Sequence, residues 1–517
     1  MRQVILLILD GWGWFSGKVG NAIAQANTPT IDFIHKNYPM VLLQASGPAV
    51  GLPWGEIGNS EVGHLTIGTG RITLQYLTRI NQAIDDGTFF ENESLLKAAK
   101  HVKSKKSKLH IMGLATSGTV HSSLKHLYAL LDFGGKQNIE NIYIHLFTDG
   151  KDSKPRESLD LLKQALDYVA KNKTGEIVCL IGRNFAMDRD ENWNLTQKAY
   201  ELLTKGEGNK TDDLLKSLKE YHGQGISDEF IPGTILNGSE GKLIEDNDAV
   251  IFFNFREDSV RQLTRAFADK EFSFFPVKSM PNLLFVTMTD YSKAFNILPV
   301  FKQPEIKNQL AEILELNNKK QLHIAETEKY AHATYFFNGL KEEPLEHETD
   351  IFIQSFKNLI ENPGMKAMEI AQKVEEEIRG ENFDFIVANF ANPDVLAHSG
   401  NFNAVVKGIG LMDEAVKKIY DSAIDKNAAL IITSDHGNAE SLFYSGTGEK
   451  ETRHNLNPVP FYLIARQYQR PRTDEEISGQ IKEVKGILAD IAPTILQLLN
   501  IPQPQEMIGN SLAEYLI

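Results

Sequence analysis

The sequence predicts an α/β protein in which parallel sheets are covered by helices. Short apolar runs rich in β-branched residues recur along the chain, and stretches with helical spacing separate them. These runs are continuously apolar rather than alternating, which is typical of strands buried on both faces in parallel sheets. At 517 residues the chain is too long for one ordinary hydrophobic core. We therefore expect two domains, each with its own core.

The apolar runs define the expected strands. In chain order they cover residues 4–9, 109–112, 142–147, 177–181, 249–253, 283–288, 385–388 and 428–432. Amphipathic helices are expected between them, for example over residues 158–170 and 487–499. The polar stretches 206–213 and 339–350 lack both patterns and are expected to be surface loops.

Polar or charged residues follow most of these runs within a few positions. They are Asp10, Asp149, Arg183, Arg256, Asp290, Asp394 and Asp435. Ligands of α/β sheets bind beyond the carboxyl ends of the strands. One such residue would mean little, because loops are polar in general. The repetition predicts a functional site at these strand ends.

The charge excludes nucleic acid or an anionic membrane as a bulk partner. The formal net charge is -14, so long-range attraction to polyanions is absent. An anionic small-molecule substrate must be met by a local group of cations. The short basic run 100–108 is interpreted as a solvated surface.

Cysteine content and hydropathy indicate the compartment. Cys179 is the only cysteine, lies in an apolar run, and is expected to be a buried small residue in a reducing environment. The apolar run 4–9 is too short for a signal-peptide core, and no run approaches the roughly 20 residues of a membrane span. We expect a cytoplasmic protein that acts as a monomer.

The stretch Gly58 to His64 (GNSEVGH) combines a turn with a hydroxyl group. Gly58 and Gly63 allow the backbone to approach a ligand closely, and Ser60 is placed to open a helix whose free N–H groups suit an anion. Two interpretations of Ser60 are open at this point. It is an N-cap, the common role of such a serine, or it is a nucleophile.

Residue types that bind metals lie in three later segments and after the first strand. Asp394 and His398 are four residues apart, which suits either a shared ligand site or a surface Asp–His pair. Asp435 and His436 directly follow a strand that would deliver both to one edge. The potential ligands are Asp10, Ser60, Asp394, His398, Asp435, His436 and His454. Carboxylates and imidazoles without cysteine suit Mn²⁺ or Zn²⁺, and this number suffices for a two-metal phosphoryl-transfer site.

The middle of the chain supplies groups suited to an anion. They are His121, Lys151, Asp152, Arg183, Arg189, Arg256 and Arg261. Guanidinium groups that follow strands favour bidentate recognition of carboxylate and phosphate. Each arginine alone is also explained by a surface ion pair. Lys329 adds a further cation, for which a solvated lysine is the alternative.

Together these motifs resemble those of the cofactor-independent (2,3-bisphosphoglycerate-independent) phosphoglycerate mutases, in the alkaline phosphatase superfamily. The resemblance covers nearly the full length. The matching stretches, in order, are residues 8–13, 58–65 with 67–68, 117–121, 182–183 with 186–190, 325–332, 389–398, 433–438, and 454 with 457–460.

The resemblance implies two α/β domains. An alkaline-phosphatase-like α/β sandwich would comprise residues 1–74 and 301–517, and an inserted transferase domain residues 75–300. By similarity, Asp394, His398 and His454 would hold one Mn²⁺, and Asp10, Ser60, Asp435 and His436 the other, with Zn²⁺ or Co²⁺ as alternatives. The positions that match substrate-binding residues are His121, Asp152, Arg183, Arg189, Arg256 and Lys329. Ser60, Asp152 and Lys329 would be catalytic.

Three positions depart from the family pattern, which usually has arginine there: Lys151, Ser259 and His323. Lys151 keeps a charge but loses the planar fork, whereas Ser259 loses the charge. We expect Arg261 to compensate partly for Ser259, and we count Lys151 and Arg261 among the substrate-binding residues. The segment 355–366 also departs.

The expected function is that of a glycolytic and gluconeogenic isomerase. It would interconvert 3-phosphoglycerate and 2-phosphoglycerate through a phosphoserine on Ser60, without 2,3-bisphosphoglycerate. Asp152 would handle the proton of the substrate hydroxyl. One alternative is a metal-dependent phosphomonoesterase or a mutase of another phosphosugar. A metal-stabilised binding protein is a further alternative, but it leaves Ser60 unexplained.

Overall fold

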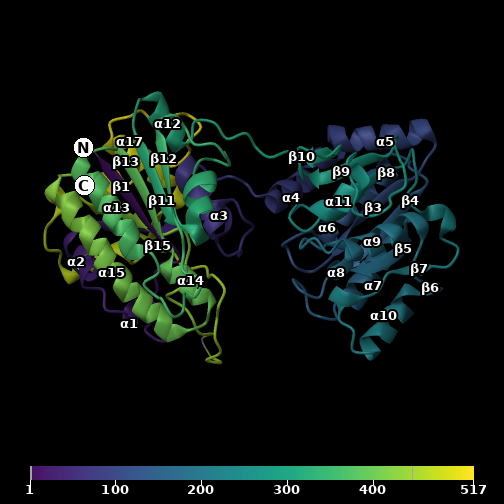
Figure 1. Ribbon diagram of the computed structural model, residues 1–517, viewed down its shortest axis with the longest axis horizontal. Helices are drawn as coiled ribbons and strands as arrows, with labels where there is room; N and C mark the ends of the chain where they lie inside the picture. Colours follow the sequence, from purple (N-terminus) through teal and green to yellow (C-terminus); the bar gives the residue numbers. More distant parts are fainter. Residues whose placement is uncertain (1–2, 445, 517) are drawn as a thin grey trace. The chain divides into compact units, whose positions relative to one another are not determined.

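The structure, a computed structural model, describes residues 3–444 and 446–516. The chain divides into two compact units (Figure 1). Unit 1 comprises Met1–Gln75 and Glu305–Ile517, and unit 2 comprises Tyr76–Pro304. The boundaries expected from the sequence, after residues 74 and 300, differ from these by one and four residues. Within the described ranges, no helix has the length and apolar character needed to cross a membrane.

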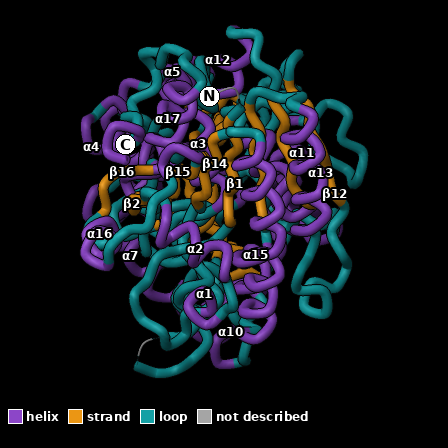
Figure 2. Tube along the Cα trace, turned by 90° about the vertical axis from the view of Figure 1, so that its left-hand side faces the viewer, coloured by secondary structure: helices purple, strands orange, loops and turns teal. Residues whose placement is uncertain are grey.

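Unit 1 contains one mixed sheet to which both ends of the chain contribute. The strand order is β12 (Glu348–Ile353), β11 (Gln321–Glu326), β13 (Phe385–Phe390), β1 (Val4–Leu9), β14 (Ala429–Thr433), β15 (Val459–Ile464), β2 (Met40–Gln44) and β16 (Val484–Ile487). The strands from β12 to β14 are parallel, whereas β15 is antiparallel to both of its neighbours. Figure 2 shows β1, β14 and β15 among the strands of this sheet. The N-terminal strand therefore lies between two strands from the last third of the chain.

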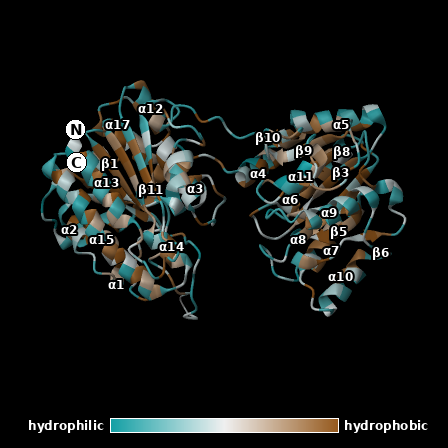
Figure 3. Ribbon diagram, viewed as in Figure 1, coloured by the Kyte–Doolittle hydropathy of each residue, from teal (hydrophilic) through white to brown (hydrophobic). Residues whose placement is uncertain are grey.

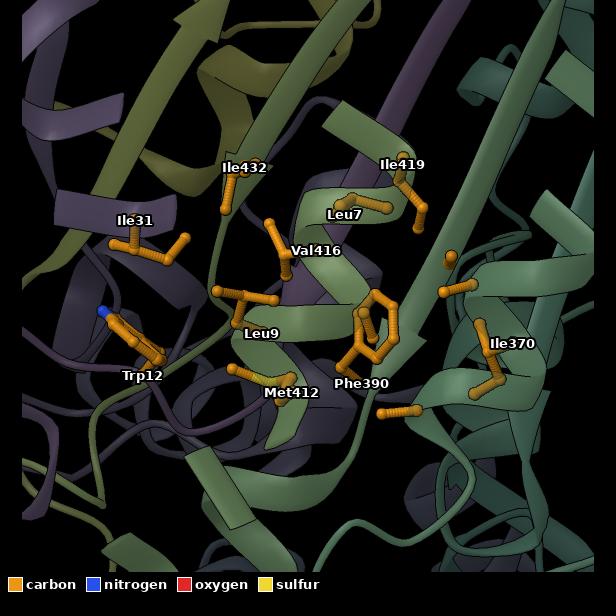
Figure 4. Packing of buried hydrophobic residues seen from close by; sticks show 14 of the residues in the cluster. Leu7, Leu9, Trp12, Ile31, Ile370, Phe390, Met412, Val416, Ile419 and Ile432 are labelled. Atoms are coloured by element: carbon orange, nitrogen blue, oxygen red, sulfur yellow. The ribbon is translucent and has the colours of Figure 1, made fainter. Parts of the chain in front are cut away.

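The central strand β1 is buried on both faces, as its continuous apolar sequence predicts. Leu7 and Leu9 pack on one face, together with Val416 (Figure 4). Leu6 and Ile8 alternate to the other face. The helices of the first face are α2 (Pro29–Asn37), α13 (Ala367–Gly380) and α15 (Phe402–Asp425). Those of the second face are α3 (Ser60–Thr69), α12 (Leu310–Leu316) and α17 (Ile491–Leu498).

Unit 2 has a sheet of its own, also covered on both faces. The strand order is β10 (Leu298–Phe301), β9 (Leu284–Thr289), β8 (Ala249–Phe252), β3 (Leu109–Ala115), β4 (Ile142–Thr148), β5 (Glu176–Gly182), β7 (Thr234–Leu236) and β6 (Asn209–Thr211). The first six strands are parallel, and β7 is antiparallel to β5. Figure 3 shows that strands β3, β5 and β8 are hydrophobic.

The remaining α-helices lie around these sheets. In unit 1 they are α1 (Ala22–Gln25), α14 (Asn392–His398), α16 (Asp474–Gln480) and α18 (Ala513–Leu516). In unit 2 they are α4 (Tyr76–Asp86), α5 (Glu93–Lys105), α6 (Leu124–Lys136), α7 (Ser158–Asn172), α8 (Arg183–Ala186), α9 (Trp193–Lys205), α10 (Leu214–Gly223) and α11 (Arg261–Ala268).

The predicted α/β class with two α/β domains is confirmed, and every apolar run expected to be a strand is one. Three local expectations are wrong. The expected loop 206–213 contains β6, a polar three-residue strand at the sheet edge, and the expected loop 339–350 contains the start of β12, an edge strand that exposes Thr349. The expected helix 487–499 begins only at Ile491, because Ile487 pairs with Gln44 of β2.

Two glycines of α3 hold this helix close to neighbouring backbone. A Cβ on Gly68 would lie 2.0 Å from the carbonyl oxygen of Phe337, and one on Gly63 would lie 2.6 Å from that of Asp435. Only glycine permits such an approach. The two glycines therefore fix the position of Ser60, the first residue of α3.

Buried polar side chains form a hydrogen-bonded chain across the sheet of unit 2. Nε2 of His110 lies 3.2 Å from Oδ2 of Asp248, and its Nδ1 lies 3.0 Å from Nε2 of His145. Nδ1 of His145 lies 3.2 Å from Sγ of Cys179, which is free and buried as expected. Burial lowers the pKa of both histidines, although Asp248 opposes this at His110. Both rings are therefore neutral near pH 7.

Gly68→Ala is expected to destabilise unit 1, because the new methyl group would overlap a backbone oxygen. Overpacking of this kind costs about 1–3 kcal/mol. Gly410→Ala in α15 is the matched control. There the nearest atom to an added Cβ is the carbonyl oxygen of Asn27 at 3.5 Å, so alanine should stabilise the helix by about 0.5–1 kcal/mol. Urea unfolding should show effects of opposite sign, and effects of the same sign would contradict the packing argument.

Unit 2 is expected to lose stability as the pH falls from 7 to 5. An unfolded histidine binds a proton near pH 6.5, whereas His110 and His145 in the folded state do so only at lower pH. Protons therefore favour the unfolded state below pH 6.5, by up to about 1.4 kcal/mol per pH unit for each histidine. The protection factors for amide hydrogen exchange in β3 and β4, which are already corrected for the intrinsic pH dependence, should therefore decrease as the pH falls. His145→Gln should reduce this dependence, and an unchanged dependence would contradict the assignment.

Candidate active site

The sequence-predicted metal ligands come together at one edge of the sheet in unit 1. Asp10, Asp394 and Asp435 follow β1, β13 and β14, which are parallel neighbours, so their carboxyl ends meet. Because β15 is antiparallel to β14, the segment before it carries His454 to the same edge. Lys329 follows β11, which is parallel to β13. Topology alone therefore collects residues that are far apart in the sequence.

Asp394, His398 and His454 form the first ligand group. Oδ1 of Asp394 lies 3.2 Å from Nε2 of His398 and 3.1 Å from Nε2 of His454. The two Nε2 atoms lie 3.0 Å apart. Asp394 and His398 both belong to α14, one helical turn apart, so the pair predicted from their spacing is formed.

Ser60 lies in the second group, at the N-terminus of α3. Its Oγ lies 3.1 Å from Oδ1 of Asp10 and 3.0 Å from Nε2 of His436. The N-cap interpretation of Ser60 is wrong, because Asn59 occupies the cap and accepts the N–H of Val62 at 3.1 Å. Ser60 is instead the first helical residue, with its hydroxyl group free to face the ligands.

Lys329 is buried between the two groups. Its Nζ lies 2.7 Å from Oδ1 of Asp10, 2.7 Å from Oγ of Ser60 and 2.6 Å from Oδ2 of Asp394. The side chain is only 6% exposed. The interpretation as a solvated lysine is therefore wrong.

Charge compensation keeps this buried site ionised. Burial and Asp435 raise the pKa of Asp10, but Lys329 and His436 bring it below its ordinary value. Burial raises the pKa of Asp394, and Lys329 brings it far lower. Burial lowers the pKa of His436, but Asp435 and the other carboxylates raise it to about 9. The site therefore holds negative charge that attracts further cations.

The nitrogen and oxygen atoms of the candidate ligands are suited to binding divalent metal ions. Nδ1 of His398 donates to the carbonyl oxygen of Thr452 at 2.8 Å, and Nδ1 of His454 donates to that of Gly58 at 2.9 Å. When neutral, each ring therefore directs the Nε2 lone pair toward Asp394. At this edge of the sheet, three groups of residues place their ligand atoms within 4.8 Å of one another: Asp394 with His398 and His454, Asp10 with His64 and Asp435, and Asp10 with Asp394 and His436. This oxygen and nitrogen set suits Mn²⁺, Zn²⁺ or Co²⁺.

Two residues that orient the ligands were missed. Nδ1 of His64 donates to the carbonyl oxygen of Ser60 at 2.9 Å and lies 3.1 Å from Oδ2 of Asp435. Nδ2 of Asn389 lies 2.9 Å from Nε2 of His64 and 2.9 Å from Oδ2 of Asp10. His64 and Asn389 both lie within stretches that match the family motifs. Their position in these stretches is the sequence feature from which their role could have been predicted.

Glu440 was also missed, and it connects three loops of the site. Its Oε2 accepts the backbone N–H of Gly13 at 2.9 Å and of Asn438 at 3.0 Å. Its Oε1 accepts from Nδ2 of Asn457 at 2.9 Å. A Cβ on Gly13 would lie 2.2 Å from the Glu440 carboxyl group. The loops that follow Asp10 and His436 are thus tied to the segment after His454.

Unit 2 gathers cations beyond the carboxyl ends of its own parallel strands. We call the arginines Arg183, Arg189 and Arg256, together with His121, which is neutral near pH 7, the cationic cluster. Nη1 of Arg183 lies 2.6 Å from Oδ1 of Asp149 and 2.5 Å from Oδ2 of Asp152. Nε2 of His121 lies 3.6 Å from Oδ2 of Asp152. Burial, followed by the positive charge of Arg183, lowers the pKa of His121 to about 4.

Asp258 connects the other members of the cationic cluster. Its Oδ2 lies 2.7 Å from Nη1 of Arg189 and 3.3 Å from Nε of Arg256. Its Oδ1 lies 3.8 Å from Nδ1 of His121. The sequence showed Asp258 beside Arg256 but gave no sign that one carboxylate would bridge them.

The residues that depart from the family pattern form hydrogen bonds with residues close to them. Lys151 has an exposed side chain and donates its backbone N–H to Oδ1 of Asp149 at 3.2 Å. Ser259 is buried and donates its backbone N–H to Oδ1 of Asp258 at 2.8 Å. Nε of Arg261 donates to the carbonyl oxygen of Tyr291 at 2.8 Å, so its guanidinium group is partly committed elsewhere. In unit 1, His323 is buried and donates to the carbonyl oxygen of Ala333.

The chain is similar to known phosphoglycerate mutases. A family model described as BPG-independent PGAM N-terminus matches residues 80–293. The 2,3-bisphosphoglycerate-independent phosphoglycerate mutase of Clostridium botulinum is 43% identical over 516 residues, covering 99% of each chain. That of Antithamnion sp. is 43% identical over 520 residues, also with 99% coverage of each chain. A crystal structure of Leishmania mexicana phosphoglycerate mutase at low cobalt concentration matches with a TM-score of 0.71 and 26% identity, covering 98% of this chain and 97% of that chain.

Glu440→Ala is expected to weaken divalent-metal binding about 10- to 100-fold, because three ligand-bearing loops lose their common acceptor. Glu440→Gln retains one carbonyl oxygen and should lie between the alanine variant and the wild type. Titration of metal-free protein with MnCl₂ measures the affinity without turnover. Glu449→Ala removes an exposed carboxylate nearby and is the control. Unchanged affinity in Glu440→Ala would show that the loops keep their geometry without this carboxylate.

Proposed function

The chain belongs to the 2,3-bisphosphoglycerate-independent phosphoglycerate mutases, and on this premise we propose that it interconverts 3-phosphoglycerate and 2-phosphoglycerate through a phosphoserine on Ser60. The observation that carries the proposal is the environment of Ser60 Oγ. It contacts a lysine, a carboxylate and an imidazole within one buried site. A structural serine does not need these partners.

The chain's own residues prepare Ser60 for phosphoryl transfer. Its position at the start of α3 places its hydroxyl group at the positive end of the helix dipole, which favours a negatively charged phosphoryl group there. The ammonium group of Lys329, 2.7 Å from Oγ, is placed to offset negative charge that develops on the phosphoryl oxygens. Asp10 accepts the hydroxyl proton of Ser60 in a hydrogen bond.

We assign the metal ligands as the sequence predicts. Asp394, His398 and His454 would hold one divalent ion, and Asp10, Ser60, Asp435 and His436 the other. Bound ions, for which we propose Mn²⁺, would supply positive charge that favours the ionised hydroxyl of Ser60. His64, Asn389 and Glu440 orient these ligands through the contacts described above.

A mutase must also keep the dephosphorylated glycerate. We assign this task to unit 2, where the cationic cluster suits carboxylate and phosphate groups. Asp152, held by Arg183 at 2.5 Å, is placed to exchange a proton with a substrate hydroxyl. Retention makes the return of the phosphoryl group effectively intramolecular, and it separates a mutase from a phosphatase that releases its product.

Ser60→Ala is expected to reduce mutase activity at least about 10³-fold, because the phosphoryl acceptor is lost. The measurement is an enolase-coupled assay from 3-phosphoglycerate with Mn²⁺ and without 2,3-bisphosphoglycerate. Acid quenching of the wild type followed by peptide mass spectrometry should place one phosphoryl group on Ser60. Ser104→Ala is the control, since Ser104 is exposed on α5 and donates only to the carbonyl oxygen of His101 among the described residues.

Product analysis tests the alternatives. Steady release of inorganic phosphate without 2-phosphoglycerate would replace the mutase proposal with a metal-dependent phosphomonoesterase. Full activity of Ser60→Ala would require another nucleophile. A requirement for added 2,3-bisphosphoglycerate would defeat the proposed phosphoserine route.

A further inference from the structure

We propose that Asp258 is an internal counter-ion of the cationic cluster, which an anionic substrate displaces when it binds, so that this carboxylate sets the KM for phosphoglycerate. The inference rests on the proposed function. It adds to the cluster a residue that determines affinity and is not itself a cation.

The first argument is that Asp258 occupies positions suited to a substrate anion. Its Oδ2 lies 2.7 Å from Nη1 of Arg189 and 3.3 Å from Nε of Arg256. Its Oδ1 faces Nδ1 of His121 at 3.8 Å, and this buried nitrogen has no hydrogen-bond partner among the described residues. Carboxylate and phosphate oxygens recognise guanidinium groups with this geometry. One carboxylate thus takes the place of ligand oxygens at three cluster members.

The second argument is that Asp258 can leave, whereas Asp149, the fully buried carboxylate that contacts the cluster, cannot. Asp149 is 1% exposed and also accepts from Thr116 and from the backbone N–H groups of Lys151 and Asp152. The side chain of Asp258 is 30% exposed. Apart from the cluster, Asp258 is held by the adjacent Ser259, through its N–H at 2.8 Å and its hydroxyl at 3.3 Å.

The two arginines that Asp258 bridges are also partly exposed to solvent. The side chain of Arg189 is 53% exposed and that of Arg256 is 48% exposed. Rotation of the Asp258 side chain toward water would release both guanidinium groups and would break only the two hydrogen bonds from Ser259. Ion pairs at this exposure contribute little free energy, so a ligand with several negative charges can replace the internal one.

The third argument concerns charge. Burial raises the pKa of Asp258, but Arg256 and His121 bring it below its ordinary value, so the carboxylate is ionised at neutral pH. Phosphoglycerate carries a phosphate and a carboxylate. An ionised Asp258 therefore competes for the same donors and repels the ligand until it moves away.

The experiment is to measure KM and kcat for 3-phosphoglycerate in Asp258→Asn with the full chain and Mn²⁺. We expect KM to fall about tenfold at low salt, equivalent to about 1.4 kcal/mol, with no increase in kcat. The difference should shrink as KCl is raised from about 0.05 to 0.5 M, because salt screens exposed charges. Asp258→Ser provides a second neutral variant should the first fold poorly. Asp258→Glu keeps the charge and should retain a KM close to that of the wild type.

Asp246→Asn is the matched control. Asp246 is a carboxylate of unit 2 that accepts the backbone N–H of Asn282 at 2.7 Å and precedes β8, so it lies at the amino ends of the parallel strands, away from the cationic cluster. Its neutralisation removes the same unit of charge and should leave KM unchanged. An equal fall in KM in both variants would attribute the effect to net charge and overturn the proposal.

The remaining outcomes are also decisive. A KM in Asp258→Asn that equals or exceeds the wild-type value overturns the proposal, since it would show that Asp258 positions the arginines or contacts substrate. Arg256→Ala separates this result from failure of the proposed function. If Arg256→Ala raises KM while Asp258→Asn does not lower it, only the counter-ion role fails. If Arg256→Ala leaves KM unchanged, the cluster is not the glycerate site, and both assignments fall.

Discussion

The candidate active site depends on one ammonium group placed among buried carboxylates. Nζ of Lys329 contacts Asp10 and Asp394 directly, and Asp435 lies in the same buried region. Carboxylates buried without compensating charge are strongly unfavourable. The fold must therefore deliver a cation to the edge where three strands deliver acids. β11 does so, because it runs parallel to β13 and ends at the same edge. Lys329 thus has two roles: it compensates the charge of the buried carboxylates, and it contacts Ser60, the proposed nucleophile.

The sequence predicts the central part of each sheet and most of the charged groups at the site. β1 and β14 consist almost entirely of apolar residues because both of their faces are covered, and an acid follows each of them within two residues. The same pattern fails at the sheet edges. β12 is the first strand of its sheet and has exposed positions, so it does not show the signal of a buried strand. Its edge position, rather than weak propensity, explains why it was missed. β15 was missed for a different reason, because it is an interior, fully buried strand whose apolar run is interrupted by Pro460.

The missed residues share a different cause. Glu440 and Asp258 act through hydrogen bonds and ion pairs whose partners are distant in the sequence or attached to neighbouring loops. Spacing identifies two candidate ligands on one helix, as with Asp394 and His398, because helical geometry fixes their separation. It cannot reveal that the carboxylate of Glu440 accepts an N–H from Gly13, 427 residues away. Such contacts follow from the tertiary structure, so the residues that orient a site are harder to predict than those that perform its chemistry.

The charged groups of the two units differ in burial and in how firmly they are held. In unit 1 the charges are buried and each is held by several contacts within the protein, as at Lys329, so their positions are closely fixed. In unit 2 the charges of Arg189, Arg256 and Asp258 are partly exposed and neutralise one another. Phosphoryl transfer needs a fixed acceptor atom, since small displacements reduce the rate strongly. Under the proposed function, glycerate must by contrast present two different hydroxyl groups in turn, so its contacts have to be broken and formed again. Exposed, exchangeable ion pairs suit that task, and a rigid buried set would oppose it.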